Sequence, residues 1–436
     1  MKTYGFAKGG FVYEDKSAPK RDKSVVAFLP ALSVLPLVQH AGPAVKPVVS
    51  IGDHIGEGMV VGRAHAHGAA NIHAAVPGRV VRSVQWPMPD GRTSPALVVR
   101  LEGSFEKLGK RQDLFVWHGL PATELQKIIA EKGVVELEEP GRPIAELVAE
   151  ARSSGRKATV VVRAVFDDPW LVADYAVCAE RLDAIVEGVA IIVKAAGAER
   201  ALFAVSANEL ALGEAFVASA ARFELSAEVV ALENRYPQRN RRELEAALRR
   251  YEKREGRDLG DLLPASPSTF AAVYDAVRLN KPLVERYVAI GGGAVKEPSV
   301  LRVRIGTRIG DAIAECGGFV EEPKRIVTGS PLTGLEVFDL DSPITKTTVA
   351  VVAMTDKQIG GTTVRDCIGC GECRNVCPVG LDPERLFKLA RQGRHEAALA
   401  DGAAACHGCG CCAALCPSRL PLSAMIRRSA ELGEHK

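Results

Sequence analysis

The spacing of apolar and polar residues divides the chain into regions with different periods. Residues 1–38 are polar and interrupted by Gly and Pro, which predicts an N-terminal arm. Over residues 39–103, short β-branched runs alternate with glycine-containing turns, for example at residues 52–53 and 77–78. This alternation is typical of hairpins, because glycine adopts the positive φ angles of tight turns. The region is therefore expected to form a small β-sandwich or barrel.

The period changes after residue 103. Over residues 104–285, strand-like runs such as 159–162 alternate with helical patterns such as 175–198, which predicts an α/β domain. Over residues 286–353, short strands surround one helix at residues 309–315, which predicts a compact mixed module.

Residues 354–436 carry helical patterns between two groups of cysteines, including one helix expected over residues 383–399. The whole chain is thus predicted to be a multidomain α+β protein whose C-terminal domain is helical.

Composition excludes several classes of protein. Apolar residues make up 47% of the 436 positions and charged residues 25%, as in globular proteins. The net charge of +3 gives no support to nucleic-acid binding. The most apolar stretch, residues 184–198, is interrupted by Glu187 and Lys194, so no membrane-spanning helix is expected. The N-terminus lacks the apolar core of a secretory signal, and we expect a cytoplasmic protein.

Cysteine spacing carries the clearest chemical signal. Nine of the 11 cysteines lie between residues 367 and 416, and eight of these form two runs of the form C-x2-C-x2-C-x3-C-P, which is the spacing of bacterial ferredoxins. In such pairs the first three thiolates of a run bind one [4Fe-4S] cluster and the fourth binds the other cluster. The first cluster is therefore assigned Cys367, Cys370, Cys373 and Cys416, and the second is assigned Cys406, Cys409, Cys412 and Cys377. Zinc is the alternative, but it favours paired C-x2-C knuckles.

Three further cysteines have no place in this pattern. Cys411 is expected to lie beside the ligand Cys412 without binding iron, although an exchange of the two is the alternative. Cys178 and Cys316 lie in apolar helical patterns and are expected to be buried core residues.

A charged segment precedes the mixed module. Residues 235–258 contain nine Lys or Arg against five Asp or Glu. The pattern is typical of a solvated helix, and the alternative is a docking surface for an acidic partner. Its candidate docking residues are Arg239, Arg241, Arg242, Arg249 and Arg250.

The order of motifs resembles the C subunit of the Rnf electron-transport complex over nearly the whole chain. The matching segments are residues 9–11, 36–44, 47–53, 72–78, 283–286, 298–307, 329–334 and 343–347, followed by the two cysteine runs. The resemblance implies a biotinyl-like β-barrel at residues 39–103 and an α/β domain at residues 104–285 like the flavin subunit of complex I. It also implies an SLBB module at residues 286–353 and a helical two-cluster ferredoxin domain at residues 354–436.

The same resemblance implies a function. The chain would be the iron–sulfur electron-transfer subunit of an ion-translocating oxidoreductase, with other Rnf-type membrane subunits as partners. It would lie on the inner face of the cell membrane without spanning it. The barrel lacks the lysine hairpin that carries biotin, so no biotin is expected.

Three segments depart from the family pattern. Residues 133–143 replace a glycine-rich phosphate loop and bring in Glu136, Glu138, Glu139 and Pro140. Residues 163–169 and 236–243 replace two further motifs of the FMN and NADH pocket. Carboxylates repel a phosphate and proline offers no N–H donor. We therefore expect no tight binding of FMN or NADH, and an exchange of electrons with a soluble ferredoxin or flavodoxin-like carrier.

Three other functions stay open from the sequence. The first is a soluble flavin and iron–sulfur reductase of the cobalamin-reductase type, which needs the same glycine loop. The second is an NADH-oxidising member of the Rnf family despite the altered loop. The third is a docking protein without redox activity, against which the eight intact ligands argue.

Overall fold

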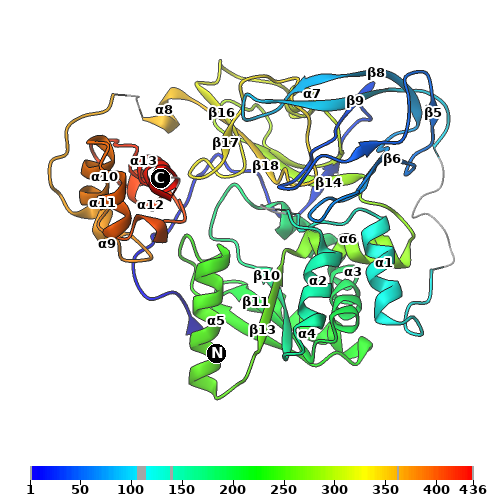
Figure 1. Cartoon of the computed structure of the whole chain (residues 1–436), viewed down its shortest axis with the longest axis horizontal. Helices are drawn as coiled ribbons and strands as arrows, with labels where there is room; N and C mark the ends of the chain where they lie inside the picture. Colours follow the sequence, from blue (N-terminus) through cyan, green and yellow to red (C-terminus); the bar gives the residue numbers. More distant parts are fainter. Residues whose placement is uncertain (1, 106–113, 138–140, 361–362, 435–436) are drawn as a thin grey trace.

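The computed structural model describes residues 2–105, 114–137, 141–360 and 363–434. The α/β domain lies below the barrel and the SLBB module in Figure 1, and the cysteine domain forms a separate lobe at one side. Helix α5 (Arg241–Glu255) stands at the side of the α/β domain nearest that lobe.

The α/β domain is built on a parallel five-stranded sheet. Its strand order is β1 (Thr3–Tyr4), β12 (Ala227–Leu232), β11 (Arg200–Ser206), β10 (Ala158–Ala164) and β13 (Asp261–Ala265). The covering helices are α1 (Ala122–Glu131), α2 (Ile144–Ser153), α3 (Ala173–Ala196), α4 (Leu210–Ala220), the 3-10 turn Ala221–Phe223, α5 and α6 (Pro267–Arg278). Strand β10 is buried along almost its whole length, as a central parallel strand must be.

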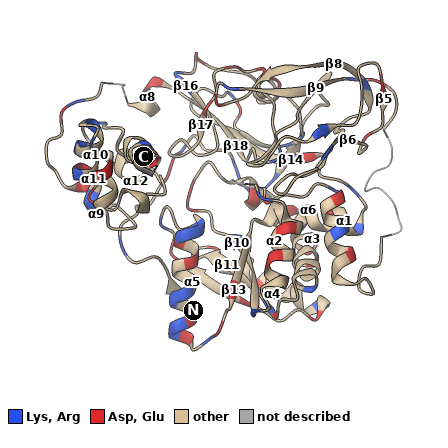
Figure 2. Ribbon diagram, in the orientation of Figure 1, with Lys and Arg blue, Asp and Glu red and all other residues tan. Residues whose placement is uncertain are grey.

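Helix α5 shows how one stripe of the charged segment is buried. Its residues Leu244, Ala247, Leu248 and Tyr251 recur at helical spacing and pack on the outer face of the sheet. The other faces carry most of the Lys and Arg of the segment (Figure 2). The predicted solvated helix is thus confirmed over residues 241–255.

The SLBB module is a mixed six-stranded sheet with one helix. Its strand order is β17 (Leu335–Glu336), β16 (Arg325–Thr328), β18 (Ala350–Met354), β14 (Glu285–Gly291), β15 (Ser299–Arg304) and β2 (Ser24–Val26). Helix α7 (Ile309–Glu315) has the predicted bounds. Its buried face includes Ile309, Ala312 and Ile313.

The barrel module contains two antiparallel sheets. The first has the order β3 (Leu32–Pro36), β9 (Thr93–Leu101), β8 (Gly78–Pro87) and β5 (His54–Ile55). The second has the order β4 (Lys46–Pro47), β6 (Val60–Arg63) and β7 (Ile72–His73).

The N-terminal arm joins three sheets. Strand β1 pairs with β12 of the α/β domain, β2 pairs with β15 of the SLBB module, and β3 pairs with β9 of the barrel. The arm therefore crosses the three modules as a strap.

The cysteine domain consists of short helices. They are α8 (Asp356–Ile359), α9 (Glu372–Asn375), α10 (Pro383–Arg391), α11 (His395–Ala400), the 3-10 turn Ala403–Ala405, α12 (Cys411–Ala414) and α13 (Leu422–Glu434). The expectation of a single helix over residues 383–399 is wrong. The chain breaks at residues 392–394, where Gly393 has a φ of 68°, and α10 and α11 pack separately against α13.

No helix in the ranges that the structure describes has the length and apolarity needed to cross a lipid bilayer.

Candidate metal centres and the adjoining cleft

The two cysteine runs fold alike. In each run a glycine with a positive φ, Gly371 at 78° or Gly410 at 80°, follows the second cysteine and begins a one-turn helix, α9 or α12. A residue with a side chain is strained at such an angle, which explains the glycine at this place in both runs. The local geometry is therefore the same around both sets of thiols.

The first cavity gathers thiols from both runs. It is lined by the side chains of Cys367, Cys370, Cys373 and Cys416. Phe387 and Leu420 close its apolar side. The fourth cysteine of the second run thus lies with the first three of the first run.

The second cavity has the reciprocal composition. It is lined by Cys377, Cys406, Cys409, Cys411 and Cys412. The backbone N–H of Leu381 donates to the sulfur of Cys377 at 3.3 Å, the kind of bond that stabilises a thiolate. Cys411 is fully buried, and it donates to the sulfur of Cys409, which lowers the pKa of Cys409 to about 7.

Each cavity presents a set of cysteine thiols from both runs. Four cysteine thiolates are the usual ligands of a [4Fe-4S] cluster. The donor sets therefore fit two such clusters.

The remaining cysteines lie in the core, as predicted. Cys178 in α3 and Cys316 at the end of α7 are each 1% exposed. Burial raises the pKa of both thiols, so neither is a reactive group.

Contacts from the arm and the α/β domain hold residues of both runs in place around the second cavity. Gly9 packs so closely that a Cβ there would lie 2.6 Å from the carbonyl of Cys377. The Tyr236 hydroxyl donates to the carbonyl of Cys409 at 2.7 Å, and Arg242 donates to the carbonyl of Ala405 at 2.7 Å. Sequence analysis missed these contacts, because no local pattern shows which distant residues meet.

A large open cleft adjoins the second cavity. Its volume is about 1140 Å³, and its walls come from all four modules. They include Gln39 and His40 of the barrel, Arg163, Tyr236 and Arg239 of the α/β domain, Thr345 and Thr347 of the SLBB module, and His407 beside the second cavity.

His407 lies 2.9 Å from the carboxylate of Glu243, which is 2% exposed in α5. Burial disfavours the charged imidazole, but the contact with Glu243 outweighs it and raises the pKa of His407. The residue was not singled out from the sequence, because a single histidine between two ligands has many explanations.

The loop that replaces the glycine-rich segment uses its own backbone donors. The N–H groups of Gly133, Val134, Glu136 and Leu137 all donate to oxygens of the chain itself. A phosphate held by a backbone loop needs such groups free. The described part of this loop therefore does not fit an FMN phosphate. Glu138, Glu139 and Pro140 lie outside the described residues.

A buried lysine fixes the same loop to two other modules. Lys346 of the SLBB module is 1% exposed and donates to the carbonyls of Gly133 at 2.7 Å and Asn71 at 2.6 Å. Burial lowers the pKa of Lys346 to about 7. The sequence placed this lysine in a family motif but did not indicate its role.

Glu136, which is expected to repel a phosphate, is 9% exposed, and its carboxylate accepts a hydrogen bond from Thr269. One expectation about charge is wrong. Arg239 does not belong to the exposed face of α5: it precedes the helix, is 4% exposed and lies near the buried carboxylates of Asp167 and Asp174. Both side chains are held by long-range partners that a local charge count does not include.

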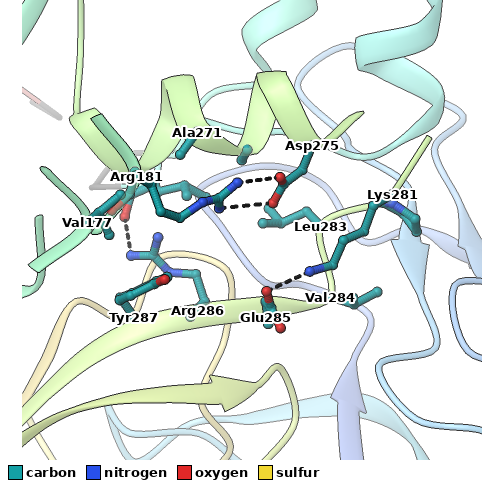
Figure 3. Close-up of a pocket in the computed structure, with 14 residues that line it drawn as sticks. Val177, Arg181, Ala271, Asp275, Lys281, Leu283, Val284, Glu285, Arg286 and Tyr287 are labelled. Carbon is teal, nitrogen blue, oxygen red and sulfur yellow. Dashed lines mark hydrogen bonds and ion pairs between the residues drawn. The ribbon is translucent and has the colours of Figure 1, made fainter. Parts of the chain in front are cut away.

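A further small cavity, lined by no cysteine, lies between α3, α6 and β14 (Figure 3). The Arg181 guanidinium makes two hydrogen bonds to Asp275 at 2.5 and 3.1 Å, and Lys281 pairs with Glu285 at 2.6 Å. Because these charges pair with one another, they are not available to bind a charged ligand in this cavity.

Four domain families match successive parts of the chain. Residues 4–104 match the RnfC barrel sandwich hybrid domain, and residues 129–262 match the Nuo51 FMN-binding domain. Residues 287–336 match the SLBB domain, and residues 363–420 match the 4Fe-4S dicluster domain. The predicted fold class is confirmed, and these domains define a multidomain iron–sulfur redox protein.

Curated relatives identify the family. The C subunit of the proton-translocating ferredoxin:NAD(+) oxidoreductase complex of Clostridium ljungdahlii is 32% identical over 90% of this chain and 86% of that protein. The C subunit of the ion-translocating oxidoreductase complex of Rhodobacter capsulatus is 31% identical over 90% of this chain and 76% of that protein. The chain belongs to this family, the C subunits of Rnf-type ion-translocating oxidoreductase complexes.

More distant similarity agrees with the fold. The C subunit of the Na(+)-translocating ferredoxin:NAD(+) oxidoreductase complex of Acetobacterium woodii is 27% identical over 86% of this chain and 84% of that protein. A chain in the crystal structure of an H2-reduced NAD+-reducing [NiFe]-hydrogenase has a TM-score of 0.51 at 14% identity, covering 72% of this chain and 62% of that chain. That likeness concerns the fold alone.

Proposed function

We propose that this chain relays single electrons through two [4Fe-4S] clusters as a subunit of an Rnf-type ion-translocating oxidoreductase complex. The observation that carries the proposal is the reciprocal composition of the two thiol cavities. When bound, such clusters take up and release one electron each. The protein positions the ligands and supplies N–H donors to their sulfurs, as Leu381 does for Cys377.

Serine variants of single cysteines test the assignment of ligands. If the fourth cysteines cross over, C377S damages the same cluster as C409S, and C416S damages the same cluster as C370S. Iron content and electron paramagnetic resonance spectra of the four anaerobically purified variants decide this. C316S is the matched control, because Cys316 is buried away from both cavities. A spectrum of C377S that matches that of C370S would contradict the crossing.

The electron partner in this proposal is a small acidic carrier, such as a ferredoxin or flavodoxin. The support is the basic exposed surface of α5, which carries Arg241, Arg242, Arg249 and Arg250. Arg242 also contacts the residue that precedes the ligand Cys406, so this surface lies beside the second cavity. Electrostatic steering predicts that the reduction rate falls steeply as salt is added. A rate that does not change with salt in a stopped-flow measurement would contradict this partner.

The proposed location is the inner face of the cell membrane, where partner subunits hold the chain. The support is that the relatives are named as subunits of ion-translocating complexes. Fractionation of native cells with and without the membrane subunits tests this. Full retention of the chain on membranes that lack those subunits would contradict attachment through partners.

A second candidate function is oxidation of NADH through a bound FMN. The cleft of about 1140 Å³ favours it, because this volume exceeds the ~300–1000 Å³ of ordinary ligand pockets and the cleft reaches His407. The protein is purified with FMN present and mixed with NADH under anaerobic conditions. Stoichiometric flavin and fast bleaching of the iron–sulfur absorbance would establish this function in place of the first.

A further inference from the structure

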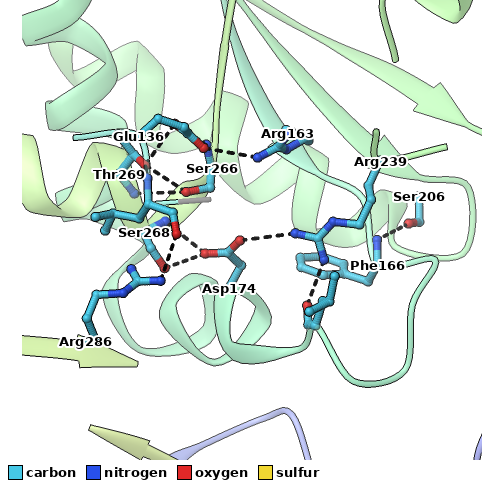
Figure 4. Close-up of polar contacts among 12 residues, drawn as sticks. Glu136, Arg163, Phe166, Asp174, Ser206, Arg239, Ser266, Ser268, Thr269 and Arg286 are labelled. Atoms are coloured by element: carbon cyan, nitrogen blue, oxygen red, sulfur yellow. Dashed lines mark hydrogen bonds and ion pairs between the residues drawn. The ribbon is translucent and has the colours of Figure 1, made fainter. Parts of the chain in front are cut away.

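The three segments that depart from the family pattern meet in one buried polar network (Figure 4). Glu136 comes from the first segment, Arg163 and Asp167 from the second, and Arg239 from the third. The Glu136 carboxylate lies 3.1 Å from the Arg163 guanidinium, and Asp167 accepts the backbone N–H of Arg239 at 3.0 Å. Each of the three segments therefore contacts another of them through a polar group.

The network covers the first turn of α6. Ser266 is the N-cap of this helix, and its backbone N–H donates to Glu136 at 3.2 Å. The Thr269 hydroxyl donates to the same carboxylate at 3.0 Å. The N-terminus of a helix carries free N–H groups and a partial positive charge, and both favour an anion. Glu136 supplies that anion from within the chain.

A second carboxylate completes the cover. Asp174 accepts the backbone N–H of Ser268 at 3.2 Å and also its hydroxyl, and it lies 3.8 Å from the Arg239 guanidinium. Asp174 is 6% exposed and Arg239 is 4% exposed. Buried charges persist when each has a partner and its hydrogen bonds are made. The segments thus form a closed arrangement and not a set of unrelated losses.

We propose that the Glu136 carboxylate is an internal anion that takes the place of a phosphate monoester at the first turn of α6 and closes this part of the α/β domain to FMN. The proposal rests on the proposed function, in which the chain works without FMN. It adds the reason why FMN does not bind: Arg163, Ser266 and Thr269 form an anion site, and the Glu136 carboxylate occupies that site.

Replacing Glu136 tests the proposal. E136Q keeps the volume of the side chain but removes its charge, and E136G also opens space. Both variants are expected to gain saturable binding of FMN, at least about tenfold tighter than that of the unaltered chain, and of inorganic phosphate. Flavin fluorescence quenching measures the first ligand, and thermal stabilisation by added phosphate measures the second. E131Q is the matched control, because Glu131 is exposed and lies five residues earlier.

The outcomes separate this inference from the proposed function. Stoichiometric FMN on the unaltered chain would overturn both. An unaltered chain without FMN, together with folded E136Q and E136G that bind neither FMN nor phosphate, would overturn this inference alone. If E136Q folds poorly, phosphate should restore its yield and its cluster content, and no restoration counts against the proposal. E136Q/R163M should lose the gained binding, because Arg163 is part of the anion site.

Discussion

Gly9 offers a sharp test of how the N-terminal arm supports Cys377, the last cysteine of the first run, at the second cavity. Gly9 has a φ of 70°, and a Cβ there would lie 2.6 Å from the backbone carbonyls of Val376 and Cys377. The adjacent Gly10 N–H donates to the carbonyl of Val376 at 2.9 Å. The G9A substitution should therefore push the arm away from Cys377, a proposed cluster ligand.

The expected cost has two parts. A residue with a side chain in the left-handed region costs about 1–2 kcal/mol. Forcing a methyl group against backbone atoms that cannot rotate away costs a further ~1–3 kcal/mol. The G256A substitution is the matched control, because Gly256 has a φ of 62° and a Cβ there meets no atom of the described residues within 4 Å. G256A should therefore show only the first part.

The assay combines iron content, the spectrum of the second cluster and urea unfolding. The free energy of unfolding of G9A should be lower than that of G256A by the steric cost of the methyl group. The second cluster of G9A should also be lost to a chelator faster. Equal stability and equal chelator resistance in the two variants would refute the close packing of the arm on Cys377.

Buried and exposed side chains give three further predictions. Burial lowers the pKa of Lys346 to about 7 from its ordinary 10.5, so between these pH values the unfolded chain binds one more proton than the folded chain. The free energy of unfolding should therefore rise with pH in urea unfolding from pH 7 to 10, and this rise should be absent in K346M. The Y236F substitution removes the hydrogen bond to the Cys409 carbonyl and should lower the free energy of unfolding in urea by about 0.5–1.5 kcal/mol. The second cluster should also be lost to a chelator faster, and unchanged values of both would contradict a stabilising role of this hydrogen bond. R254E on the exposed surface of α5 should slow reduction of the clusters by an acidic carrier and weaken the salt dependence of that rate, whereas K324E at the edge of the SLBB module should do neither. Equal effects of the two variants in stopped-flow measurements would contradict α5 as the docking surface.

Local pattern was enough to predict several elements. Helix α7 has the bounds that its apolar spacing and the Gly317–Gly318 pair indicate, and both cysteine runs form the expected loops. These features depend on neighbours in sequence, which spacing records. The predicted single helix over residues 383–399 is wrong because Gly393 adopts a positive φ and turns the chain. The helix-favouring residues on both sides of Gly393 do not continue the helix through this turn.

Long-range partners could not be predicted in this way. The arm contributes strands to three sheets, and Lys346 reaches two carbonyls from other modules, yet neither contact has a local signal. The partners of Glu136, Arg163 and Thr269, lie far along the chain, and the sequence did not indicate them. The site prediction was therefore strongest where the ligands follow a fixed spacing.

We expect this chain to carry two iron–sulfur clusters and no flavin. One quantification of iron, sulfide, zinc and flavin per chain, on protein purified anaerobically with FMN present, tests it directly. We expect about eight irons and eight sulfides with no stoichiometric flavin. About four irons, zinc in place of iron, or one FMN per chain would contradict it.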